Sequence, residues 1–288
     1  MAFKKLKIFF DMIRVEHTLF ALPFAYIGAM LVEKKIPSGH DLFWITLAMV
    51  GARTAAMSLN RIIDLHIDAK NPRTANRALP RGLLTVAEVW VYVILSLALL
   101  LVSAYNLSPL AFKLSPLAVA LLVFYPYTKR FTWTCHLILG LALGAAPVGA
   151  WVAIANRFDL APLVLAAGVT FWVAGFDIIY GCDDYHFDRA EGIHSIPARF
   201  GIKNALKLSA AFHLLAFVFF ASVGLLLDLG IFYYAGMVLV AALLFYQHRL
   251  VRPGDLSRSG VAFFNLNAGL SAVTFAFTLL DVVFGYSL

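Results

Sequence analysis

The chain has 288 residues, of which 62% are apolar and 14% are charged, and its mean hydropathy is +0.85. Soluble domains are about 45–50% apolar and about 25% charged, so this composition excludes a water-soluble globule and makes lipid the natural solvent. The net charge of +7 does not indicate nucleic acid, because the cations are dispersed over short segments between apolar runs, as in membrane proteins.

The first 17 residues are basic and lack the continuous apolar run of a cleaved signal peptide, so we interpret them as an amphipathic lead-in on the cytoplasmic side. Nine apolar segments follow, each near the length of about 20 residues that a spanning helix needs. They lie at residues 16–33, 41–63, 86–106, 109–127, 133–155, 160–181, 206–228, 230–248 and 261–284. We therefore predict an all-α membrane bundle of nine transmembrane helices, forming a single domain over residues 1–288.

The Lys and Arg residues predict the orientation, because cytoplasmic loops of membrane proteins are enriched in both. With nine spans and a cytoplasmic N-terminus, most of the 23 cations fall on the cytoplasmic side. Only four fall on the other: Lys34, Lys35, Lys113 and Arg157. The C-terminus is then predicted outside. The loops after the second and sixth spans are the longest and most charged, and we expect the functional site there.

Three polar residues end the second span with the spacing i, i+4, i+8: Asn60, Asp64 and Asp68. On an α-helix this spacing places them along one face, each about 6 Å from the next along the axis. Carboxylates this close to a membrane are costly unless they are paired or bind metal, so the pattern indicates function. Arg53 lies seven residues before Asn60, on a similar face and deeper in the span.

The end of the sixth span repeats this pattern with Tyr180, Asp184 and Asp188, and Asp177 falls on nearly the same face seven residues before Asp184. Each acidic helix end is followed by a basic segment that contains Pro and Gly. The two segments, at residues 60–68 and 177–188, are therefore interpreted as pseudo-repeated Asp motifs.

Hard cations take oxygen ligands, and Mg²⁺ in particular uses one or two carboxylates together with substrate phosphates. Two acidic faces opposite each other, with cations beside them, therefore favour a Mg²⁺–diphosphate complex over a bare cation site. The nearby cations suited to phosphate oxygens are Lys70, Arg73, Arg77, Lys129 and Arg130.

Four stretches resemble the UbiA superfamily of intramembrane prenyltransferases, and the resemblance covers nearly the whole chain. The two Asp motifs match its patterns NxxxDxxxD and DxxYxxxDxxxD. Residues 125–132 resemble its YPxxKRxT stretch, and residues 73–82 resemble its RTxxRPLxxG loop. The resemblance implies transfer of a polyprenyl group from polyprenyl diphosphate to an aromatic acid such as 4-hydroxybenzoate, in ubiquinone or menaquinone biosynthesis. It also implies a bacterial inner membrane, with the active site facing the cytoplasm and the C-terminus in the periplasm.

Two stretches depart from the members that act on 4-hydroxybenzoate. Cys135-His136 stands where those members often have Pro-Gln, and residues 14–24 are similar instead to a bacterial subgroup. Some of that subgroup serve menaquinone synthesis by the futalosine route, with 1,4-dihydroxy-6-naphthoate as the acceptor. A haem precursor or a chlorophyll intermediate is a further alternative acceptor.

The motifs predict a role for each site residue. Mg²⁺ is held by Asp64, Asp68, Asp184 and Asp188. The diphosphate is bound by Arg73, Arg77, Lys129 and Arg130. The acceptor is faced by Arg53, Asn60, Asp177 and Tyr180. The catalytic set comprises Asn60, Tyr180 and the five motif aspartates.

Two other classes of protein compete with the enzyme. An ion-coupled secondary transporter also uses intramembrane acids, but it places them near the bilayer midplane in broken helices, whereas these lie at span ends beside phosphate-suited cations. A structural membrane protein has no need of the acidic faces. The bilayer and the two substrates are the predicted partners, and nothing in the sequence identifies a protein partner.

Overall fold

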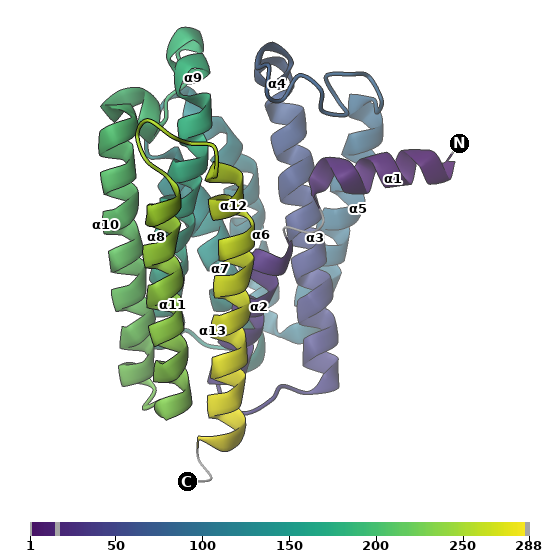
Figure 1. The fold of residues 1–288 in the computed structure, drawn as a ribbon. Coiled ribbons are helices and arrows are strands. Elements are labelled where there is room, and N and C mark those ends of the chain that lie inside the picture. Colours follow the sequence, from purple (N-terminus) through teal and green to yellow (C-terminus); the bar gives the residue numbers. More distant parts are fainter. Residues whose placement is uncertain (1, 15–17, 286–288) are drawn as a thin grey trace.

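The fold is that of a computed structural model, which describes residues 2–14 and 18–285, with side chains for residues 5–14 and 21–285. All regular secondary structure within these residues is helical, and the only bridge among them is an isolated one between Arg252 and Asp255. The prediction of an all-α bundle is confirmed. The long helices stand side by side, and α1 (Ala2–Ile13) lies across one end of the bundle (Figure 1).

Within this described part of the chain, eight helical segments are long and apolar enough to cross a membrane. They are α3 (Gly39–Ile63), α5 (Val86–Leu107), α6 (Pro109–Phe124) with the 3₁₀ helix η2 (Tyr125–Arg130), α7 (Cys135–Ala155), α8 (Leu160–Gly181), α10 (Ile196–Leu226), α11 (Ile231–Leu250), and α12 (Ser259–Phe263) with α13 (Asn265–Phe284). The span predicted at 16–33 is the shorter helix α2 (Thr18–Leu31). Residues 16 and 17 of the predicted span lie outside the described part.

One predicted boundary was wrong by ten residues. The span expected at 206–228 begins at Ile196, because Ser195 caps the helix by accepting a hydrogen bond from the Ala198 backbone N–H. Gly201 interrupts the helical backbone with a φ of 77°, a conformation that glycine adopts without strain. These additional residues bring the start of α10 close to the second Asp motif.

The outer surface of the bundle is apolar, as a lipid solvent requires. On α5 one face is buried at Val89 and Val93, whereas Ile94 and Leu95 on the other face are 62% and 61% exposed. A soluble protein seldom exposes so continuous an apolar face. These side chains therefore meet acyl chains.

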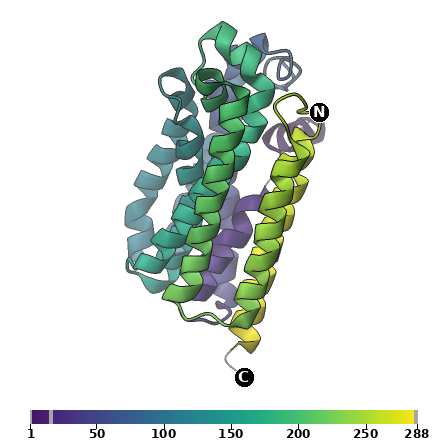
Figure 2. The same cartoon turned by 60° about the vertical axis from the view of Figure 1, so that its left-hand side comes forward.

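Small residues bring the central helices together. A Cβ atom on Gly140 of α7 would lie only 2.3 Å from the Thr170 carbonyl oxygen of α8. Such close backbone approach is how membrane helices gain packing energy, since burying apolar groups gives no advantage in lipid. The contacts place α8 between α7 and α10, and α11 beside α13 (Figures 1 and 2).

Both motif helices break at the aspartate that stands four residues before the last aspartate of the motif. Helix α3 ends at Ile63 and the short helix α4 (Leu65–Lys70) follows, with Asp64 between them at φ −91° and ψ 4°. Likewise α8 and the 3₁₀ helix η3 (Cys182–Asp184) end at Asp184, whose φ is −94° and ψ is 3°, before α9 (Tyr185–Glu191). The single straight helical face expected for each motif is thus divided, and the two halves repeat the same break.

Candidate active site

A cavity of about 1080 Å³ lies at the end of the bundle that carries α1, α4 and α9. Eleven of the twelve predicted site residues line it, and they are Arg53, Asn60, Asp64, Asp68, Arg73, Arg77, Lys129, Asp177, Tyr180, Asp184 and Asp188. Arg130 is the exception. Deeper along α7 and α8 the lining becomes apolar, with Leu139, Leu143, Val173 and Phe176. The cavity therefore joins a charged mouth to an apolar interior.

Asp64 lies at the break between α3 and α4 and is only 2% exposed. Its carboxylate accepts hydrogen bonds from Asn60 Nδ2 at 2.8 Å, Lys129 Nζ at 2.6 Å and Arg130 Nη1 at 3.2 Å. A buried carboxylate needs such donors, because desolvation otherwise makes its charge very costly. The basic segment of η2 is thereby placed against the first Asp motif.

Arg130 has an additional, structural task. Its guanidinium donates to the backbone carbonyl oxygens of Pro126, at 2.9 Å, and Ile63, at 2.7 Å. These bonds tie η2 to the end of α3. Arg130, which was predicted to bind the diphosphate, thus binds backbone carbonyl groups instead and does not line the cavity.

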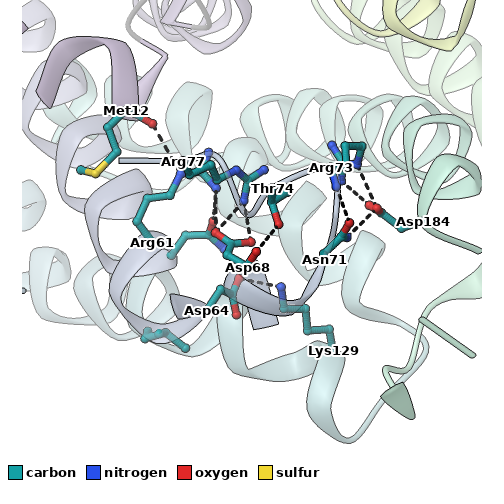
Figure 3. A network of polar contacts seen from close by, with 12 residues as sticks. Met12, Arg61, Asp64, Asp68, Asn71, Arg73, Thr74, Arg77, Lys129 and Asp184 are labelled. Carbon is teal, nitrogen blue, oxygen red and sulfur yellow. Dashed lines mark hydrogen bonds and ion pairs between the residues drawn. The ribbon is translucent and has the colours of Figure 1, made fainter. Parts of the chain in front are cut away.

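Asp68 lies one turn further, on α4, and is 5% exposed. Arg77 Nη1 donates to both of its carboxylate oxygens at 2.7 Å (Figure 3). Arg61, which is also buried, approaches the same carboxylate at 3.9 Å and donates to the Met12 carbonyl oxygen of α1. The Thr74 hydroxyl donates to the Asp68 carbonyl oxygen at 2.9 Å and holds the following loop, residues 71–82, over α4.

The 71–82 loop joins the first motif to the second. Asn71 Nδ2 donates to Asp184 Oδ1 at 2.8 Å, and Arg73 donates to both oxygens of Asp184 (Figure 3). Arg73 also donates to the Tyr180 hydroxyl at 2.6 Å and lies over the Tyr180 ring. Burial alone lowers the pKa of Arg73, but the hydrogen bonds and charge of Asp184 outweigh it and raise that pKa, so Arg73 is a permanent cation.

The two remaining aspartates of the second motif have no Lys or Arg as a hydrogen-bond partner among the described side chains. Asp188, 8% exposed, accepts a hydrogen bond from the Ser195 hydroxyl at 2.7 Å. Asp177 lies 2.7 Å from Nδ1 of His136, through its oxygen Oδ2. The motif thus contains carboxylates in three different environments.

The donor set fits Mg²⁺ used together with a diphosphate. Within the described residues no three His, Cys, Asp or Glu side chains cluster closely enough to hold a metal alone. Mg²⁺ does not need such a cluster, because it takes one or two carboxylates and completes its shell with waters and substrate phosphates. Each motif offers two aspartates to the same cavity, and all the offered ligands are oxygens.

Three residues of the site were not predicted. In the sequence Asn71 and Arg61 resemble ordinary loop and span-end residues, although both lie within three positions of a motif residue. His136 stands out there only as a departure from a family pattern. Proximity to the motifs was the available signal for the first two, whereas the partner of His136 is far away in the sequence.

The chain is similar to proteins of known sequence and structure over most of its length. The model of the UbiA prenyltransferase family matches residues 21–269. A UbiA homolog from Aeropyrum pernix K1, solved in its apo form, has a TM-score of 0.85 and 37% identity over 92% of this chain and 98% of that chain. The 4-hydroxybenzoate octaprenyltransferase of Haemophilus ducreyi is 33% identical over 252 residues, 87% of each chain. A UbiA homolog from Archaeoglobus fulgidus bound to GPP and Mg²⁺ shares the fold, with a TM-score of 0.73 and 20% identity over 96% of this chain and 99% of that chain.

Proposed function

The chain belongs to the UbiA prenyltransferase family, and from this premise we propose that it transfers a polyprenyl group from polyprenyl diphosphate to an aromatic acid such as 4-hydroxybenzoate, in quinone biosynthesis. The observation that carries the proposal is the convergence of two Asp-rich helix ends and their cations on one cavity with an apolar interior. Relatives named 4-hydroxybenzoate octaprenyltransferase support the acceptor class.

Mg²⁺ is the proposed cofactor, with Asp64 and Asp68 as ligands from one motif and Asp184 and Asp188 from the other. Bound there with the diphosphate, it neutralises the charge that develops as the diphosphate leaves. The UbiA homolog solved with GPP and Mg²⁺ is a precedent from the same fold.

The cations at the mouth bind the diphosphate oxygens in this proposal. Arg73, Arg77 and Lys129 line the cavity, and each now donates to an aspartate. When the substrate arrives, these donors turn from carboxylate to phosphate oxygens, for which the forked Arg side chain is well suited. Arg130 supports them by holding η2 in place.

The apolar interior takes the prenyl chain and keeps water from the reacting carbon. The bond between the first prenyl carbon and the diphosphate oxygen breaks, and a ring carbon of the acceptor forms the new carbon–carbon bond. The ring proton then leaves to a nearby base or to the released diphosphate. Arg53, Asn60, Asp177 and Tyr180 face the acceptor, with Arg53 toward its carboxylate.

The chain is a multi-pass membrane protein. We propose the bacterial inner membrane, with the N-terminus and the active site on the cytoplasmic side, the C-terminus in the periplasm, and one domain throughout. The basic loops at the end of the bundle that carries the cavity support this orientation.

The test is transferase activity of the purified protein in lipid nanodiscs with Mg²⁺ and radiolabelled polyprenyl diphosphate. 4-Hydroxybenzoate and 1,4-dihydroxy-6-naphthoate are supplied side by side, and the product identifies the acceptor. Asp64→Asn and Asp184→Asn are expected to lower the rate at least about 100-fold, since each removes a group that stabilises charge in the transition state. The control is Arg81→Ala, an exposed cation in the same loop region. Near-normal activity of both Asn variants, or no transfer to any aromatic acid, overturns the proposal.

A further inference from the structure

His136 is a buried imidazole in the first turn of α7, 4% exposed, and it lines the cavity. Two hydrogen bonds hold it. Nδ1 lies 2.7 Å from Asp177 Oδ2, and the Ile196 backbone N–H donates to Nε2 at 3.4 Å. A backbone N–H can only donate, so Nε2 must be the accepting nitrogen. The ring proton is thereby assigned to Nδ1, which directs it at Asp177.

The helices around His136 are shaped to receive the ring. Gly181 stands one turn after Asp177 on α8, and a Cβ atom on Gly181 would lie 3.1 Å from His136 Cε1 and 3.7 Å from the Pro197 ring of α10. Helix α8 thus presents a carboxylate and, one turn later, the space for the imidazole. A side chain fixed by packing and two hydrogen bonds keeps its partner in one orientation as well.

Asp177 differs from the three motif aspartates that bind Lys or Arg side chains. Its partner His136 is an imidazole at the start of α7, before the lining becomes apolar, and the Asp177 side chain is 23% exposed in the cavity wall. Since His136 binds Oδ2, the oxygen that Asp177 offers to a ligand is Oδ1. A carboxylate oxygen only accepts hydrogen bonds, so its ligand must donate one, and the donor on a hydroxylated aromatic acid is the ring hydroxyl.

We propose that His136 is a positioning residue that holds Asp177 to accept a hydrogen bond from the ring hydroxyl of the acceptor, and that this pair selects hydroxylated aromatic acids. The inference rests on the proposed function. It adds the element that distinguishes a phenolic acid from the same acid without its hydroxyl, while the diphosphate end of the site is unaffected.

The test uses two variants of His136, one that keeps a hydrogen-bond donor near Asp177 and one that moves the donor away. In His136→Asn the amide nitrogen takes the place of Nδ1, so the bond to Asp177 is retained. In His136→Gln the amide lies near the position of Nε2, so the bond is lost at similar polarity. Steady-state assays on purified protein in nanodiscs give KM for 4-hydroxybenzoate and, separately, for polyprenyl diphosphate. We expect His136→Gln to raise KM for 4-hydroxybenzoate about tenfold, the size of one hydrogen bond to a charged group. We expect it to leave KM for polyprenyl diphosphate within about twofold. His136→Asn is expected to keep both within about threefold.

A second measurement isolates the hydroxyl. Unlabelled benzoate and 4-hydroxybenzoate compete, in separate assays, against the labelled acceptor. Wild type is expected to prefer 4-hydroxybenzoate over benzoate about tenfold. His136→Gln and Asp177→Ala are expected to abolish this preference. The double variant is expected to match Asp177→Ala alone, because His136 acts through Asp177. A merely structural role would weaken both competitors equally.

The outcomes separate the two proposals. Wild type that transfers to no aromatic acid refutes the proposed function, and the inference falls with it. Active wild type with an unchanged acceptor KM in His136→Gln, or with its preference intact in Asp177→Ala, overturns the inference alone. If His136→Gln does not fold, Asp177→Ala still decides, since it leaves the His136 ring in the niche beside Gly181.

Discussion

At the scale of single residues, the site is a set of buried and half-buried charges, most of them held in opposite-sign pairs. Asp64, Asp68 and Asp184 each accept hydrogen bonds from a Lys or Arg that comes from a different segment of the chain. Removing one member leaves the other desolvated and uncompensated, which is more costly than the pair itself. The pairs therefore stabilise the loops in the position that the chemistry requires.

Arg61 is the clearest stability prediction at this scale. It is 8% exposed and connects α3 with Met12 of α1 and with Asp68. Arg61→Ala is expected to lower the free energy of unfolding by about 2 kcal/mol, because the partner groups stay buried without it. Thermal unfolding in detergent and limited proteolysis of α1 measure the effect. The matched control is the exposed Arg81→Ala, expected within about 0.5 kcal/mol. Equal stability of both variants contradicts the assigned contacts.

Residue types and spacing predicted most of the charged residues that line the cavity, because acids repeated at i, i+4 along a span end are rare in membrane proteins outside functional sites. The partners of those residues were not predictable. Asn71 reaches Asp184 across 113 positions, and His136 reaches Asp177 across 41. Such pairs depend on how helices pack, which local sequence does not encode.

At the scale of elements, each motif is a long helix, a break and a short helix. The break at Asp64 and at Asp184 turns α4 and α9 away from their parent helices at the same end of the bundle (Figure 1). Both aspartates have backbone angles of the bridge region, where active-site residues are often found. The repeated break supports the interpretation of the segments as pseudo-repeats.

The crossing of α7 and α8 positions His136 against Asp177, so widening it is expected to disturb the acceptor end. Gly140→Ala places a methyl group 2.3 Å from the Thr170 carbonyl oxygen, and we expect it to destabilise the protein by about 1–3 kcal/mol. Gly149→Ala on the same helix has no atom within 4 Å of its Cβ and is expected to be neutral or to stabilise by up to about 1 kcal/mol. Thermal unfolding of both variants in one detergent measures the difference. A Gly140→Ala protein as stable as wild type shows that the two helices do not meet so closely.

Hydropathy predicted which segments are helical, because backbone groups in lipid must be satisfied within the segment. It did not predict where α10 begins, since the first turns after Ser195 carry Arg199 and Lys203 among apolar residues. Nor did it predict the breaks at Asp64 and Asp184. These occur inside otherwise regular i, i+4 patterns, and no Gly or Pro occupies either position.

At the scale of the whole molecule, most of the charges that the cavity offers to ligands are already paired with each other. Three of the four carboxylates proposed for Mg²⁺ now accept hydrogen bonds from the cations proposed for the diphosphate. Neither ligand alone releases both partners. Binding of the two is therefore coupled, and the coupling must be equal in both directions.

We accordingly expect Mg²⁺ to bind weakly by itself and about 5–150-fold more tightly when a non-hydrolysable diphosphate analogue is present. Isothermal titration of the purified protein with Mg²⁺, with and without the analogue, measures this ratio. After chelation with EDTA, the analogue is expected to lose affinity by the same factor. The Asp184→Asn variant serves as the control and is expected to show a smaller ratio. Equal Mg²⁺ affinity with and without the analogue contradicts the exchange of partners.

The mixed lining of the cavity has a consequence for kinetics. In the proposed reaction, its charged mouth receives a water-dissolved acid, whereas its apolar interior receives an isoprenoid that dissolves only in bilayers or micelles. The effective concentration of each reactant is therefore defined in a different phase. Adding detergent at fixed amounts of both spreads the isoprenoid over more micelles and slows the reaction, as if that substrate alone were diluted. Its saturation curve should therefore collapse onto one line when plotted against mole fraction in the micelle, while that of the acid follows bulk molarity.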